Sequence, residues 1–134
     1  MPGFTAPKIN WIKNNEIDNF RKIFKVLLPK DYLRFILTGE FFSEMSDASG
    51  TLWLDIKHRK WSNKLLSCSF LEEKHMPNLV EGNELTGYLK KELKDKFNFN
   101  NNVKVVGGAG DNAAAATGMG LSLIHISEPT RHTR

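Results

Sequence analysis

The sequence has little cysteine, no long apolar run and no long segment with charge of a single sign. Its 134 residues contain one cysteine, Cys68, which cannot form a disulfide within the chain, so a small disulfide-stapled scaffold is excluded. No stretch approaches the roughly 18 consecutive apolar residues of a membrane-spanning helix. The N-terminus also lacks the charged and then apolar segments of a secretory signal. We therefore expect a cytoplasmic protein with no membrane partner.

The charge balance is weakly basic, with 19 Lys and Arg against 15 Asp and Glu and a formal net charge of +4. In the densest basic stretch, residues 90–96, acidic residues interrupt the lysines, and Glu92 and Lys96 lie four apart, as in a helix-surface pair. A solvated helix face explains this stretch at least as well as a phosphate-binding stripe. We expect no nucleic-acid partner, and a small basic binding module without catalysis stays open as an alternative.

Hydrophobic residues make up 40% of the chain and charged residues 25%, which indicates a packed core. Short helical and extended patterns alternate, which predicts an α/β architecture. The predicted helices cover residues 4–24 (broken near Asn14 and Asn15), a largely buried segment 30–38 closed by Gly39, a segment capped by Ser62, and an amphipathic segment with Leu89, Leu93 and Phe97 on one face. The predicted extended segments are 25–29, 51–56 and 103–106, with a turn at 46–50.

Several residues whose side chains could be reactive or could bind a ligand have a structural explanation instead. Cys68 resembles a small buried residue, since no base adjoins it in the sequence. His58 and His75 have no second ligand at metal spacing, so we expect surface histidines and no metal site. The three tryptophans are expected in the core or in a pocket wall: Trp11, Trp53 and Trp61.

The segment richest in chemistry is 105–120, VVGGAGDNAAAATGMG. An apolar strand enters a glycine-rich turn, and four small helix-forming alanines follow. Asp111 therefore lies where a strand ends and a helix begins, which is the edge of an α/β sheet where ligands bind. The carboxylate could be an N-cap for the helix, or it could be held ionised there and directed at a substrate hydroxyl. Neither a Walker A loop nor a dinucleotide-binding fingerprint is present.

Several runs in order resemble the FGGY carbohydrate kinases, and in particular the branch of that family that acts on D-xylulose. They begin with GFTAPKINWIKNN at residues 3–15 and continue with LPKDYLRF at 28–35 and LTGE at 37–40. SDASGTLWLD follows at 46–55, and then come Trp61-Ser62, Glu81-Gly82 and LTG at 85–87. The resemblance extends from about residue 2 to residue 120.

The resemblance implies a two-domain sugar kinase with an actin-like, ribonuclease H-like fold, in which residues 1–120 form part of the first domain. It implies ATP-dependent conversion of D-xylulose to D-xylulose 5-phosphate, with ATP and Mg²⁺ required and a homodimer possible for the full-length enzyme. Ribulose, gluconate, fuculose and glycerol are the alternative substrates in the same family. The resemblance makes Asp111 the catalytic base and places Asn112 beside the sugar. The ATP site lies outside these residues, so we expect no turnover by this chain alone.

Two features depart from the family pattern. Ala109 and Ala115 stand where many family members have glycine, and a positive φ at Ala109 would cost about 1 kcal/mol. Residues 121–134, LSLIHISEPTRHTR, resemble the translation of a sequencing-library adapter. We interpret this tail as non-native and assign no function to its histidines.

Overall fold

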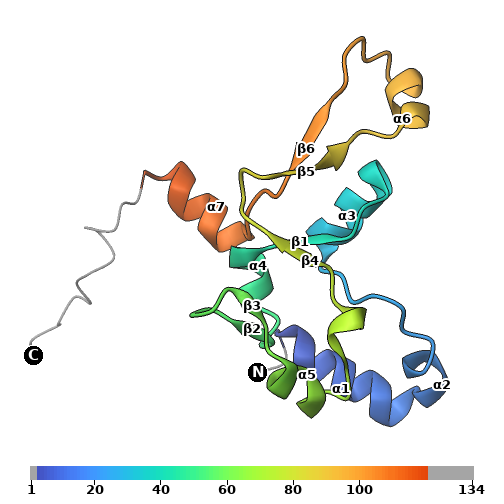
Figure 1. The fold of residues 1–134 in the computed structure, drawn as a ribbon, viewed down its shortest axis with the longest axis vertical. Helices are drawn as coiled ribbons and strands as arrows, with labels where there is room; N and C mark the ends of the chain where they lie inside the picture. The colour runs from blue at the N-terminus through green and yellow to red at the C-terminus, as the bar shows by residue number, and fades with distance from the viewer. Residues whose placement is uncertain (1–2, 121–134) are drawn as a thin grey trace, which may run out of the picture.

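Short helices and strands alternate along the chain in a computed structural model that describes residues 3–120 (Figure 1). This alternation confirms the predicted α/β class. The helices are α1 (Thr5–Asn15), α2 (Ile17–Phe20), α3 (Pro29–Thr38), α4 (Met45–Ser49), α5 (Asn63–Cys68), the 3-10 turn η1 (Glu73–His75), α6 (Lys91–Lys96) and α7 (Asp111–Gly118). The strands are β1 (Phe42–Glu44), β2 (Leu54–Asp55), β3 (Lys60–Trp61), β4 (Asn78–Val80), β5 (Leu85–Tyr88) and β6 (Lys104–Val106).

The strands of residues 3–120 pair two by two. β1 and β4 are parallel, whereas β2–β3 and β5–β6 are antiparallel. The β5–β6 pair lies beside α3, and the N–H of Lys90, directly after Leu89 and β5, donates to the Leu37 carbonyl at 2.9 Å. The pair has α6 at one end, while α7 follows from the other (Figure 1). A bulge between Leu85 and Gly87 shifts the register of this pair.

An apolar core lies between α1, α5 and the β2–β3 pair, which Figure 1 shows together at one end of the molecule. Trp53 and Trp61 are buried there, and each indole N–H is satisfied, by Ser69 Oγ at 3.0 Å and by the carbonyl oxygen of Pro77 at 2.8 Å. Trp11, in contrast, is exposed and lines an open hollow. The buried apolar residues of this core are Ile9, Ala48, Trp53, Trp61, Leu66, Leu71 and Met76.

Several predicted helix boundaries are confirmed. Gly39 ends α3 in the left-handed conformation at φ 87°, and Ser62 accepts a hydrogen bond from the backbone N–H of Leu65 at the start of α5. The first helical segment breaks at Glu16, one residue after the two asparagines. Each of these boundaries depends only on residues adjacent in the sequence, and each is present in the structure.

The predicted turn at 46–50 and strand at 51–56 were wrong in part. Residues 45–49 form α4 because the Glu44 carboxylate accepts hydrogen bonds from the backbone N–H groups of Ser46 and Asp47, at 2.8 and 3.3 Å, and so caps a helix. Leu52 then takes a positive φ of 72° in the turn that follows, and this leaves only Leu54–Asp55 as a strand.

Three burial predictions were also wrong. In α3 the buried residues are Asp31 and Arg34, whereas Tyr32 and Leu33 are exposed, because the inner side of this helix carries an ion pair. Cys68 is exposed at the end of α5. Phe97 is exposed as well, since α6 ends at Lys96, before the third residue of the predicted stripe.

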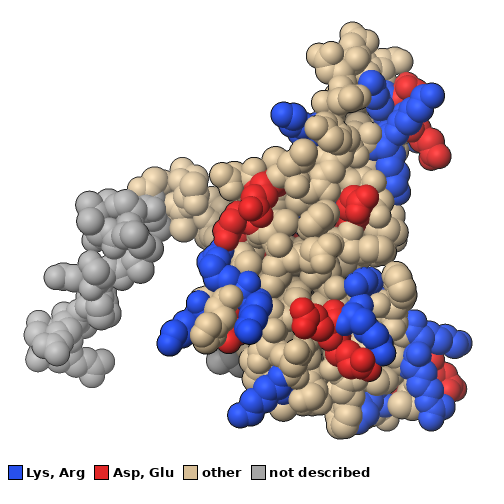
Figure 2. Space-filling model, viewed as in Figure 1, with Lys and Arg blue, Asp and Glu red and all other residues tan. Residues whose placement is uncertain are grey.

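Acidic and basic side chains are mixed on the face of the molecule shown in Figure 2, including the region around α6. This distribution agrees with a solvated helix face at residues 90–96. No helix among residues 3–120 has the length and hydrophobicity needed to cross a bilayer.

Candidate active site

The site forms where β6 passes through residues 107–110 into α7. Gly110 is the N-cap of α7, in an extended conformation at φ −61° and ψ 153°, and its carbonyl accepts the first helical hydrogen bond, from Ala114 at 2.8 Å. Asp111 is therefore the first helical residue, and the N-cap prediction for it was wrong by one position. Its Oδ1 atom accepts a hydrogen bond from the Asn112 N–H at 2.7 Å, at the helix end whose dipole favours a negative charge.

The 107–110 loop is held in place by backbone donors. The N–H of Gly107 donates to the Glu84 carbonyl at 3.0 Å, and the N–H of Gly108 donates to the Gly82 carbonyl at 2.8 Å. A β-carbon at position 107 would lie 2.2 Å from the carbonyl oxygen of Glu81, so only glycine permits this close approach. The loop is thus packed backbone against backbone.

The positive φ in this loop belongs to Gly108, at 75°, and not to Ala109. The strain considered for Ala109 is therefore absent, and alanine fits at that position. The departure from the family pattern at residue 109 does not disturb the geometry of the loop.

Charged side chains lie next to the loop. Arg34 and Asp31 form an ion pair with 3.1 Å between Nη1 and Oδ1, and both side chains are almost completely buried. Arg34 also donates to the carbonyl of Phe42 at 2.7 Å and to the carbonyl of Gly107. Lys30 Nζ lies 3.2 Å from Asp31 Oδ1, 3.5 Å from Asp47 Oδ2 and 3.4 Å from the Gly107 carbonyl oxygen. We call Lys30, Asp31, Arg34 and Asp47 the Arg34 cluster.

The other end of the loop is held by a chain of two hydrogen bonds. The Gly110 N–H donates to Ser46 Oγ at 2.9 Å, and Ser46 Oγ donates to Glu44 Oε2 at 2.6 Å. Burial alone would raise the pKa of Glu44, but the hydrogen bonds from the Ser46 hydroxyl and from the backbone N–H groups of Ser46 and Asp47 outweigh it, and the pKa lies below its ordinary value. An ionised Glu44 is therefore the form that orients Ser46 toward Gly110.

A cavity of about 470 Å³ opens beside the start of α7, within the range of small-molecule sites. Both of the site residues expected from the sequence, Asp111 and Asn112, line it. Asp47 joins them there; burial raises its pKa, and the positive charge of Lys30 opposes that shift. The lining residues are Phe4, Ser46, Asp47, Ser49, Gly50, Gly110, Asp111, Asn112 and Ala113.

This arrangement can bind and deprotonate a hydroxyl group. The Asp111 side chain is exposed to the cavity, so an incoming hydroxyl can reach its carboxylate, and the Asn112 amide supplies both a donor and an acceptor. Ser46 and Asp47 were missed as site residues by sequence reasoning. They fall within the run at 46–55 that carries the family resemblance, but their turn-like composition predicted only local structure.

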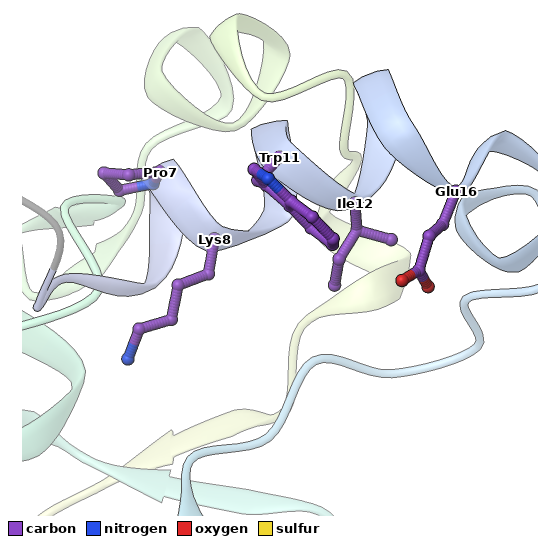
Figure 3. Close-up of a pocket in the computed structure, with 5 residues that line it drawn as sticks. All are labelled: Pro7, Lys8, Trp11, Ile12 and Glu16. Atoms are coloured by element: carbon purple, nitrogen blue, oxygen red, sulfur yellow. The ribbon is translucent and has the colours of Figure 1, made fainter.

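A second hollow, of about 560 Å³, is lined by Pro7, Lys8, Trp11, Ile12 and Glu16 (Figure 3). All five residues belong to α1 or to the residue directly after it, so one helix forms the whole lining. The cavity beside Asp111, in contrast, is lined by residues of two elements, the start of α7 and α4. We therefore place the candidate site there.

The family resemblance implies Mg²⁺, and the described residues do not build a site for it. Residues 3–120 contain no group of three His, Cys, Asp or Glu side chains placed to hold a metal ion. Asp47 is already engaged by Lys30.

The profile of the N-terminal domain of the FGGY family of carbohydrate kinases matches residues 1–118. The chain belongs to this family. As an FGGY kinase domain it has the mixed helix and strand structure of an actin-like, ribonuclease H-like fold, which confirms the predicted fold class.

Among the curated relatives of this FGGY chain, the xylulose kinase of Escherichia coli (strain K12) is 53% identical over 121 residues, which is 90% of this chain and 25% of the relative. The xylulose kinase of Klebsiella pneumoniae is 50% identical over 122 residues, covering 91% of this chain and 25% of the relative. A crystal structure of a "xyloylose kinase" from Brucella ovis superposes with a TM-score of 0.87 at 57% identity, covering 90% of this chain and 25% of that one. The chain thus spans about a quarter of the length of these relatives.

Proposed function

We propose that the full-length protein to which these residues belong catalyses the ATP-dependent phosphorylation of D-xylulose to D-xylulose 5-phosphate. The observation that carries this proposal is the Asp111 carboxylate, which faces a sugar-sized cavity at the N-terminus of α7. The xylulose kinases that are 53% and 50% identical to this chain support the choice of sugar.

In the proposed reaction Asp111 is the catalytic base. A hydroxyl oxygen of the sugar forms a bond to the γ-phosphorus of ATP, the bond between that phosphorus and the ADP oxygen breaks, and the hydroxyl proton passes to the Asp111 carboxylate. Phosphoryl transfer requires an aligned hydroxyl more than a strong base. A carboxylate fixed at a helix N-terminus meets that requirement, and the Asn112 amide would hold the sugar by hydrogen bonds.

We assign residues 1–120 to part of the N-terminal domain, with the ATP contacts elsewhere in the full-length protein. ATP as phosphoryl donor and Mg²⁺ as its counterion are expected from the family, and the use of ATP agrees with a cytoplasmic enzyme. The interpretation of residues 121–134 as a non-native tail concerns residues that lie outside the described part of the chain. On this assignment the 134-residue chain alone does not phosphorylate a sugar.

A coupled assay of ADP release by the full-length enzyme tests the proposal. D-xylulose is compared with D-ribulose, gluconate, L-fuculose and glycerol, and kcat/KM is measured for each. The highest kcat/KM is expected for D-xylulose. A clear preference for another of these substrates would refute the sugar assignment, and no activity on any of them would refute the kinase assignment. The mass of the enzyme by light scattering shows whether it is a homodimer.

A further inference from the structure

The carbonyl oxygen of Gly107 receives two positively charged donors from a helix more than 70 positions earlier in the chain. Arg34 donates to it from a nearly fully buried guanidinium group, and Lys30 Nζ lies 3.4 Å from it. Gly107 is the first residue of the loop that ends at Asp111. The position of this one carbonyl therefore sets the direction in which the chain leaves β6.

The buried Asp31–Arg34 pair is not explained by a contribution to the stability of the fold alone. A buried ion pair costs desolvation energy that well-packed apolar side chains would avoid. Asp31 uses Oδ1 for both Arg34 and Lys30, and its Oδ2 atom has no hydrogen-bond partner among residues 3–120. The pair fixes the orientation of the guanidinium group. Held by Asp31, this planar group donates from Nη1 to the Phe42 carbonyl and from Nη2 to the Gly107 carbonyl. It thereby links α3, β1 and the 107–110 loop.

We propose that Arg34, oriented by Asp31, is a positioning residue that sets the place of the Asp111 carboxylate through the Gly107 carbonyl. This inference rests on the proposed role of Asp111 as the base. It predicts that a change at Arg34 lowers the rate of phosphoryl transfer although Arg34 does not line the cavity.

The test uses the full-length enzyme with Arg34→Lys and Arg34→Ala, measuring kcat, the KM for sugar and the fraction folded at the assay temperature. Lysine can keep a positive charge beside Asp31, but its single nitrogen cannot reproduce the planar fork whose Nη1 and Nη2 atoms donate to Phe42 and to Gly107. We therefore expect kcat per folded molecule to fall about 10- to 100-fold in both variants, as a displacement near 1 Å would cause. The matched control is Arg21→Ala, which removes an exposed pair with Asp18 at the same i, i+3 spacing and should leave kcat unchanged.

Chemical rescue separates positioning from stability. Millimolar guanidinium, far below denaturing concentrations, should restore part of the kcat of Arg34→Ala and should not change the kcat of the parent enzyme or of Arg21→Ala. Unchanged kcat per folded molecule in both Arg34 variants would overturn the proposal. Failure of both variants to fold would overturn it too, because the pair would then act on stability alone.

Asp111→Asn is measured in the same series. If it loses turnover while the Arg34 variants keep theirs, the proposed function stands and the positioning role fails. If Asp111→Asn keeps near-normal turnover, the base assignment itself fails, and the positioning role of Arg34 fails with it.

Discussion

Replacing Gly107 by alanine perturbs the site without touching a charged or polar side chain. The added methyl carbon would lie 2.2 Å from the carbonyl oxygen of Glu81 and 3.2 Å from the α-carbon of Gly82. The contact with the Glu81 oxygen is the limiting one, because β-carbons in proteins stay at least about 3 Å from other heavy atoms, so the two backbones must separate by about 1 Å. Both neighbours are main chain, so no side-chain rotation can relieve the contact.

The separation has two measurable consequences. Overpacking of this kind costs about 1–3 kcal/mol in the free energy of unfolding. Because Asp111 follows four residues later, a displacement near 1 Å at Gly107 should also lower kcat by about 100-fold. Urea denaturation and the coupled kinase assay of the full-length enzyme measure the two effects.

Gly118→Ala is the matched control, because it makes the same substitution at the end of α7, where among residues 3–120 no atom beyond the adjacent residues and the helix backbone lies within 4 Å of the new β-carbon. Alanine there should leave kcat unchanged and should raise stability by at most about 1 kcal/mol. A Gly107→Ala enzyme with parental kcat would refute the claim that this close backbone approach places the carboxylate.

Two further predictions concern stability in the full-length protein. Leu66→Ala, at a completely buried position in the core, should lower the free energy of unfolding by about 2–5 kcal/mol, whereas the same change at its exposed neighbour Leu65 should cost less than about 1 kcal/mol in urea titrations. Glu44→Gln should destabilise the protein by about 1 kcal/mol at pH 7. The folded-state pKa of Glu44 lies below its ordinary value of 4.5. The ionised carboxylate therefore contributes to the free energy of unfolding above pH 4.5, and this contribution is lost as the pH falls through the folded-state pKa. The denaturation midpoints of the parent and of Glu44→Gln should accordingly converge at acid pH.

Local signals in the sequence predicted the parts of the fold that depend on local chemistry. Gly39 ends α3 and Ser62 begins α5, because a left-handed C-terminal residue and an N-cap need only their own neighbours. The strand of residues 104–106, followed by glycines and a helix, also placed Asp111 at a helix start.

The parts that depend on long-range contacts could not be predicted in this way. Arg34 and Asp31 have the composition of a solvated helix face, and their burial depends on a carbonyl at Gly107 far along the chain. Asp47 lies in a segment that is typical of a turn, and it joins the cavity only because Gly110 packs against its backbone, where a β-carbon would lie 3.3 Å from the Asp47 α-carbon. The burial of a polar residue that bonds backbone atoms of a distant loop does not produce a hydrophobic periodicity, so it cannot be recognised from the sequence pattern.

The central claim, that the Asp111 carboxylate accepts the proton of the sugar hydroxyl, is tested most directly by Asp111→Asn in the full-length enzyme. The substitution keeps the size of the side chain and removes its basicity. We predict unchanged thermal unfolding, retained binding of D-xylulose by calorimetry, and almost complete loss of sugar phosphorylation in the coupled assay. Near-normal turnover by the folded Asp111→Asn enzyme would contradict the account.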